Sequence, residues 1–189
     1  MMNVLEKLLL MREIKFEPGV ISLLNNRSIM ASVSLPVGIT VFLDANPEMI
    51  PIMYSSIREV HKSGWGKIIA EKYKMKSIEY LNQMLETTNL AGWGRTELIS
   101  FDETKTQGVF RTWRAPAAEI LKGTARKPTE TLWRAMAAGT ECAIFNKEMD
   151  VVEVNCYALG ADFCEYKFFP RASLDEESKL KYSDQIKFD

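Results

Sequence analysis

The stretch VVEVNCYALGADFCEYKFF at positions 151–169 constrains the fold more than any other part of the chain. It contains two runs rich in β-branched and aromatic residues, and these flank the sequence ALGAD, which is a pattern typical of a β-hairpin. A third run of this kind, ECAIF at 141–145, precedes them across the polar stretch NKEMD. We therefore predict a C-terminal three-strand antiparallel meander.

Helical and β patterns alternate upstream of this meander. Asn46 and Pro47 are suited to start a helix, and apolar residues then recur at helical spacing until the chain reaches Gly64. Another helix is predicted from Pro128 to Gly139, because glycine is common just past a helix end. The other predicted elements are β runs at 20–24 and 29–35 around the turn NNR, helices after position 66 and at 76–88 and 117–121, and antiparallel strands at 94–103 and 107–115. This order predicts an α+β fold with an antiparallel β-sheet packed against several helices.

The size and charge of the chain limit the classes of protein to which it can belong. A chain of 189 residues, 47% of them hydrophobic, is long enough for one domain with its own core. We expect that domain at 1–170, followed at 171–189 by a charged segment that forms a surface helix or a loose tail. No apolar run is long enough for a membrane span. A net charge of −1 argues against a nucleic-acid partner.

Cysteine and histidine usage restricts the chemistry further. The three cysteines are an odd number without a disulfide framework, which favours a reducing compartment such as the cytoplasm. His61 is the single histidine, so His-rich metal sites are excluded. Its position near the end of a predicted helix suggests an imidazole that interacts with the helix dipole.

Strand geometry gives a hypothesis for the cysteines. With hairpin turns centred on Gly160 and Glu148, Cys156 faces Cys164 across one hairpin, and Cys142 falls diagonal to Cys156 on the same face. Side chains directly opposed on neighbouring strands have Cβ atoms about 5 Å apart, which suits thiolates that share a zinc ion. A cross-strand disulfide, or three small buried side chains in a sheet, remain the alternatives.

The acid that precedes the first cysteine of this pair, Glu153, does not fit a regular strand. It precedes Cys156 by three residues, and an odd spacing sends two side chains to opposite faces of a strand. Joint ligation by Glu153 and Cys156 therefore requires a β-bulge or a strong twist between them.

The large apolar side chains suggest a pocket or a plain core. Four tryptophans and several methionines recur at helical or strand spacing, and such residues either fill a core or line an apolar cavity. The pocket candidates are Trp113, Trp133 and Met136.

The segment at 137–169 resembles the V4R (4-vinyl reductase) domain family. The family pattern is a helix that ends at glycine, a hairpin, an acid, two residues, a cysteine, a small residue, a glycine, an acid and a second cysteine. The matching residues here are Gly139, Glu153, Cys156, Ala158, Gly160, Asp162 and Cys164. The resemblance implies a V4R core at about 60–170, an antiparallel sheet packed on helices, and protomers that pair as homodimers.

The resemblance also implies a ligand and a metal. In related aromatic-sensing regulators the domain encloses a small hydrocarbon beside a zinc site, and that zinc set maps onto Glu153, Cys156 and Cys164. The family's fourth ligand is a cysteine, but the matching residue here is Glu130. Either Glu130 or Cys142 is then left to complete a tetrahedral site.

These implications give three functional hypotheses. The first is a non-enzymatic module that binds or senses a small apolar or aromatic molecule and carries a structural zinc, because four protein ligands leave no position open for catalysis. The second is a reductase of a vinyl group in tetrapyrrole metabolism, suggested by the family name, although the sequence lacks a dinucleotide-binding glycine fingerprint. The third is a protein-interaction scaffold like the trafficking relatives of the fold.

Overall fold

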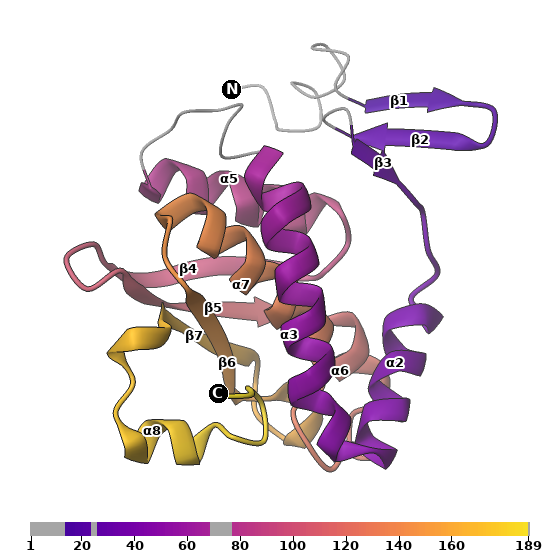
Figure 1. Ribbon diagram of the computed structural model, residues 1–189. Helices are drawn as coiled ribbons and strands as arrows, with labels where there is room; N and C mark the ends of the chain where they lie inside the picture. Colours follow the sequence, from indigo (N-terminus) through magenta and orange to yellow (C-terminus); the bar gives the residue numbers. More distant parts are fainter. Residues whose placement is uncertain (1–13, 24–25, 69–76, 189) are drawn as a thin grey trace.

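The structure is a computed structural model that describes residues 14–23, 26–68 and 77–188. Its main part is a four-stranded antiparallel sheet covered on one face by helices, and a small three-stranded sheet projects from this body (Figure 1). The strands are β1 (Ile14–Glu17), β2 (Val20–Leu23), β3 (Asn26–Ser28), β4 (Arg95–Asp102), β5 (Gln107–Trp113), β6 (Met149–Asn155) and β7 (Cys164–Pro170). The α-helices are α2 (Ser34–Ala45), α3 (Ile50–His61), α5 (Ser77–Leu90), α6 (Pro116–Ile120), α7 (Thr131–Phe145) and α8 (Glu176–Lys181).

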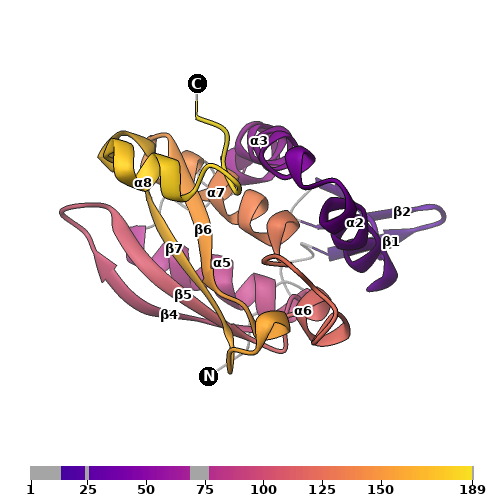
Figure 2. The ribbon, with the colours of Figure 1, turned by 90° about the horizontal axis from the view of Figure 1, so that it is seen from below.

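The α+β class and the antiparallel sheet are confirmed. The main sheet has the order β4-β5-β7-β6, so β7 joins the C-terminal hairpin to the earlier β4–β5 hairpin. The central helix α7 packs against the inner face of this sheet, and α3 crosses the far side of α7 (Figure 2). Side chains from β5 and β7 meet α7 in one core, where Phe110 and Phe168 stack with centroids 4.6 Å apart.

Several predicted elements are found where the sequence places them. The strands predicted at 94–103 and 107–115 are β4 and β5, and the helix predicted at 76–88 is α5. The helix start at Pro47 is a single 3₁₀ turn, Pro47–Met49, that leads into α3. The short helix at 117–121 corresponds to α6. The helix predicted after position 66 falls largely outside the described residues.

The predicted three-strand meander is wrong in its first strand. Residues 141–145 belong to α7, which continues through Gly139 and ends at Phe145, with Asn146 in the left-handed conformation at φ 49°. Gly139 serves helix packing, because a Cβ there would lie 2.5 Å from the carbonyl oxygen of Arg58 on α3. The absence of a side chain therefore lets the two helices cross closely and does not end α7.

The projecting N-terminal part differs partly from prediction. The run at 20–24 contains β2, which pairs antiparallel with β3, but the run at 29–35 is not a strand because helix α2 already begins at Ser34. We define the arm as β1 to β3 with α2. Its small sheet projects from the body in Figure 1, whereas α2 packs against α6, and the arm exposes many apolar side chains. Its strongly exposed members are Phe16, Ile29, Met30, Leu35 and Val41.

The C-terminal segment returns to the sheet. Helix α8 is a surface helix that lies beside β6 and β7 (Figure 2), and Asp175 caps it by accepting a hydrogen bond from the backbone N–H of Ser178. Beyond α8, Gln185 and Ile186 are buried, so this part of the predicted charged tail packs into the core.

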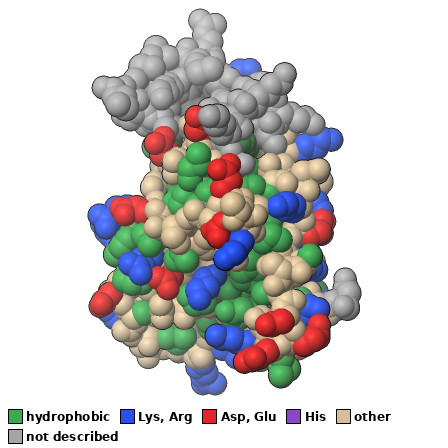
Figure 3. All heavy atoms as spheres, turned by 90° about the vertical axis from the view of Figure 1, so that its left-hand side faces the viewer, with side chains coloured by type: hydrophobic (Ala, Val, Ile, Leu, Met, Phe, Trp, Pro, Cys, Tyr) green, Lys and Arg blue, Asp and Glu red, His purple; other side chains and the backbone are tan. Residues whose placement is uncertain are grey.

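The outer surface carries mixed charge. On the face shown in Figure 3, acidic and basic side chains are intermingled with hydrophobic ones, without a patch of one sign. Among the described residues, no helix has both the length and the apolar character that crossing a bilayer requires.

Side chains close the free edge of β6, the last strand of the sheet. Arg58 donates from Nε to the carbonyl oxygen of Met149 at 2.9 Å, and the hydroxyl oxygen of Tyr54 accepts a hydrogen bond from the backbone N–H of Val151 at 2.8 Å. Both residues come from α3. An edge strand with unpaired backbone groups is costly when buried, so these contacts fix β6 in place.

Candidate metal centre and apolar cavity

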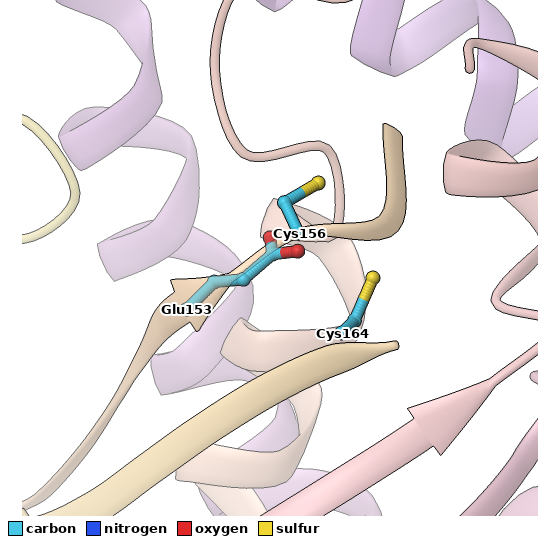
Figure 4. A group of neighbouring side chains, drawn as sticks. All are labelled: Glu153, Cys156 and Cys164. Atoms are coloured by element: carbon cyan, nitrogen blue, oxygen red, sulfur yellow. The ribbon is translucent and has the colours of Figure 1, made fainter. Parts of the chain in front are cut away.

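Glu153, Cys156 and Cys164 converge at the end of the β6–β7 hairpin. A carboxylate oxygen and the two sulfur atoms all lie within 4.8 Å of one another, and all three side chains are buried (Figure 4). Glu153 is on β6, Cys156 directly follows that strand, and Cys164 is the first residue of β7. We call these three residues the Glu-Cys-Cys cluster.

A β-bulge explains how the acid reaches the thiols. Glu153 pairs with Tyr166 and Asn155 pairs with Glu165, so Val154 is an extra residue on β6. The extra residue changes the alternation of side chains and brings Glu153 to the side of Cys156. The sequence required such an irregularity for joint ligation, and the structure has it. Continuing the register past Asn155 also places Cys156 opposite Cys164, as predicted.

The carboxyl group of Glu153 is buried and only partly hydrogen-bonded. Burial, followed by the nearby Cys156, raises the pKa of Glu153 well above its ordinary value. Its Oε2 accepts a hydrogen bond from the backbone N–H of Glu130 at 3.1 Å, whereas Oε1 has no partner among the described residues. A buried carboxylate oxygen without a partner is rare in folded proteins.

The two thiols have opposite protonation tendencies. The hydrogen bond from the Cys164 thiol lowers the pKa of Cys156 to about 5, and the same bond raises the pKa of Cys164. Thr129 supports this arrangement, because its hydroxyl lies 3.5 Å from the Cys156 sulfur. A thiolate, a second thiol and an unsatisfied carboxylate oxygen form a donor set that suits zinc.

Glu130 lies next to the cluster at the N-terminal cap of α7. Its backbone N–H contacts Glu153, while its own Oε1 accepts a hydrogen bond from the backbone N–H of Ala118 at 3.0 Å. Burial raises the pKa of Glu130 to about 7. The buried carboxyl of Glu130 is therefore adjacent to the three converging donors without being one of them.

Cys142 lies elsewhere, so the prediction that all three cysteines share one face of a sheet is wrong. Cys142 is on α7, since residues 141–145 are helical. Its sulfur accepts a hydrogen bond from the backbone N–H of Met149 at 3.2 Å, beside Arg58.

An apolar cavity of about 230 Å³ lies between the helices. It borders the arm, α3 and the turn that follows α3, α5, and α7. Its lining residues are Leu23, Ser28, His61, Trp65, Met84, Thr87, Thr88, Ala91, Trp93, Trp133, Met136, Ala137 and Thr140. A space of this size with mostly apolar walls and a few polar groups is suited to a small organic molecule.

The structure places two of the three pocket candidates at this cavity. Trp133 and Met136 line it from α7. Trp113 does not: its ring packs against Phe163, with centroids 5.8 Å apart, and Arg95 lies 4.5 Å over the ring. Trp113 is on β5 and alternates with the inward-facing Thr112, so its side chain points to the outer face of the sheet.

Sequence reasoning missed His61 as a cavity residue. It lies four residues before Trp65, one of the tryptophans considered for a cavity, so the two share one helical face, and that spacing was the available signal. Burial lowers the pKa of His61 to about 4, so its imidazole is neutral at pH 7. The expected interaction of His61 with the helix dipole stays a prediction.

Comparisons with known proteins support the fold. No family model matches the sequence, and no curated protein matches it. The chain is similar to the phenol-responsive sensory domain of the transcription activator PoxR, solved with phenol, with TM-score 0.74, 17% identity, and coverage of 95% of this chain and 94% of that one. At this identity the similarity establishes a shared fold.

Two further solved structures are more distant. A trafficking protein particle complex subunit 3 from Naegleria fowleri, covalently bound to palmitic acid, has TM-score 0.51 and 11% identity, with coverage of 76% of this chain and 95% of that one. A vinyl-4-reductase family protein from Methanocaldococcus jannaschii has TM-score 0.49 and 17% identity, with coverage of 78% and 85%.

Proposed function

We propose that this chain is a V4R-like module that binds a small apolar or aromatic molecule in the cavity between α3, α5 and α7. The observation that supports this most directly is the cavity itself, whose walls include Trp65, Trp93, Trp133 and Met136. Aromatic walls and flexible methionine side chains suit planar apolar ligands. The PoxR sensory domain, which has a similar fold, was solved with phenol, and this makes a monocyclic aromatic compound the first probe.

We also propose a structural zinc at the Glu-Cys-Cys cluster. Glu153, Cys156 and Cys164 would hold the ion, with Glu130 as the candidate fourth ligand because it is buried beside Glu153. The ion would supply charge compensation and rigidity, and no bond-making step is assigned to it. The three cysteines are free thiols, which persist in a reducing compartment, so this proposal agrees with the cytoplasm.

The exposed apolar side chains of the arm support a homodimer. Phe16 on β1 is 66% exposed and Met30, just before α2, is 81% exposed. Several large apolar side chains exposed in one part of a fold suggest an interaction surface. We propose that a second copy of the chain covers the arm.

The other two hypotheses receive no specific support from the described residues. The similarity to a trafficking subunit supports a related fold and does not indicate a scaffold role. The vinyl-reductase hypothesis depends on a family name, and the structural comparison to such a protein is too weak to argue from. We therefore retain a single functional proposal.

Ligand binding can be measured with the protein's own tryptophans. Phenol, toluene and similar monocyclic aromatics are titrated into the protein while fluorescence and binding heat are recorded. The proposal predicts saturable one-to-one binding of at least one probe, with quenching by contact to the cavity tryptophans. Lack of saturable binding across the panel up to about 1 mM, a very weak affinity for a specific site, would reject it.

A further inference from the structure

We propose that Gln185 is a positioning residue for Glu153, so that zinc binding at the Glu-Cys-Cys cluster and docking of residues 182–188 strengthen each other. This inference rests on the zinc site proposed above. It assigns a role to the C-terminal segment at 182–188, which contributes no residue to the cavity or to the Glu-Cys-Cys cluster.

The contact between Gln185 and Glu153 is a pair of hydrogen bonds. The backbone N–H of Glu153 donates to Oε1 of Gln185 at 2.9 Å, and Nε2 of Gln185 donates to the carbonyl oxygen of Glu153 at 3.0 Å. Both residues are buried. One side-chain amide therefore satisfies both backbone groups of the residue whose carboxylate belongs to the cluster.

The position of β6 explains why this pair matters. β6 is the last strand in the order β4-β5-β7-β6, so the backbone groups of Glu153 that point away from β7 have no neighbouring strand. The amide of Gln185 takes the place of that missing strand. The β-bulge begins at the next residue, so Gln185 holds the chain at the point where its regular path ends.

Other contacts fix Gln185 itself. Arg134 on α7 donates from one terminal nitrogen to the carbonyl oxygen of Val151 at 2.9 Å, and from the other to the backbone oxygen of Gln185 at 3.5 Å. Ile186 is fully buried, and Tyr182 stacks on Phe169 with ring centroids 6.1 Å apart. Residues 182–188 therefore pack against the strand that carries Glu153.

The energetic consequence is reciprocal. A metal ion needs the Glu153 carboxylate at a fixed place relative to two sulfur atoms, and residues that orient a ligand typically contribute about 10-fold to 100-fold in metal affinity. If docking of 182–188 improves zinc affinity by a given factor, zinc must stabilise the docked segment by the same factor.

The first experiment compares Gln185→Ala with Lys187→Ala, an exposed substitution two residues away. Zinc affinity is measured by competition with a chromogenic chelator, and circular dichroism checks that each variant is folded. We expect Gln185→Ala to bind zinc at least about 10-fold more weakly than wild type and Lys187→Ala to match wild type. Equal zinc affinity of folded Gln185→Ala and wild type would overturn the coupling.

The second experiment needs no substitution and therefore does not depend on the variant folding. Hydrogen exchange of the backbone amides in 182–188 is compared in wild type with zinc and after zinc removal. We expect exchange to be slower with zinc, and unchanged exchange would contradict the coupling. If wild type binds no zinc in the competition assay, the zinc site itself is rejected. If wild type binds zinc and Gln185→Ala binds it equally well, only the role of Gln185 is rejected.

Discussion

The ring of Tyr166 lies 4.5 Å from the ring of Trp133, measured between centroids. Tyr166 is also the cross-strand partner of Glu153 in the β6–β7 pairing, and Trp133 lines the apolar cavity. A single buried aromatic side chain therefore connects the Glu-Cys-Cys cluster to the wall of the cavity. Because cores are closely packed, we expect disturbance of the cluster to alter the cavity.

Substitution of one thiol tests the cluster. We expect Cys156→Ser to weaken zinc binding at least about 100-fold, because an alcohol replaces a thiolate ligand. Cys142→Ser is the matched control: its sulfur is buried beside Met149, away from the three donors, so zinc affinity should be unchanged. Chelator competition measures both. Equal zinc loss in the two variants would contradict the assignment.

Filling the cavity tests the ligand site. Met136→Trp places a bulky indole ring into a space of about 230 Å³. We expect it to weaken aromatic-ligand affinity by at least about 10-fold, since the new side chain competes with the ligand for volume. Trp113→Phe changes an aromatic residue outside the cavity and should leave affinity unchanged. Calorimetric titration of both variants distinguishes these outcomes, and full affinity in Met136→Trp would place the ligand elsewhere.

The crossing of α3 and α7 predicts a steric effect on stability. In Gly139→Ala the new Cβ would lie 2.5 Å from the carbonyl oxygen of Arg58, so we expect a loss of about 2 kcal/mol in the free energy of unfolding. Gly64→Ala has open space around the new methyl group and should be neutral or slightly stabilising. Urea denaturation measures both, and a Gly139→Ala variant as stable as wild type would show that the helices can separate without cost.

The half-buried imidazole of His61 predicts a pH dependence of stability. The folded protein holds its pKa at about 4 by burial, below the ordinary value of 6.5, so the unfolded chain takes up a proton first as pH falls. His61 therefore lowers the free energy of unfolding as pH drops from about 6.5 to about 4, by on the order of 2 kcal/mol. His61→Gln lacks this contribution.

The measurement compares denaturation midpoints of wild type and His61→Gln across that pH window. Other groups titrate in both proteins, so their effects cancel in the difference. We expect wild type to lose more stability than His61→Gln on acidification, so the difference between their denaturation midpoints should shift toward the variant. A gap that stays constant with pH would mean that the imidazole titrates normally in the folded state.

The β elements around the cluster could be predicted from the sequence because alternation and turn residues are local signals. The opposition of Cys156 and Cys164 follows from the centre of the ALGAD turn, and the need for an irregularity after Glu153 follows from its odd spacing. The occurrence of the bulge at Val154 could not be derived, because pairing with β7 decides it.

The wrong predictions have a common physical origin in tertiary packing. Gly139 has the local pattern of a helix end, yet its absent side chain serves the approach of Arg58 from α3. That contact joins residues far apart in the chain. Trp113 and Trp133 are the same residue type. In the fold, the side chain of Trp113 points to the outer surface of the sheet and that of Trp133 points to the cavity, and the sequence does not reveal this difference.

The most direct test of the account is the metal content of the protein purified without added zinc. Elemental analysis of wild type should give about one zinc per chain, and Cys156→Ser should give nearly none. A well-folded wild type with less than about 0.2 equivalents of any divalent metal would contradict the central claim that Glu153, Cys156 and Cys164 form a metal site.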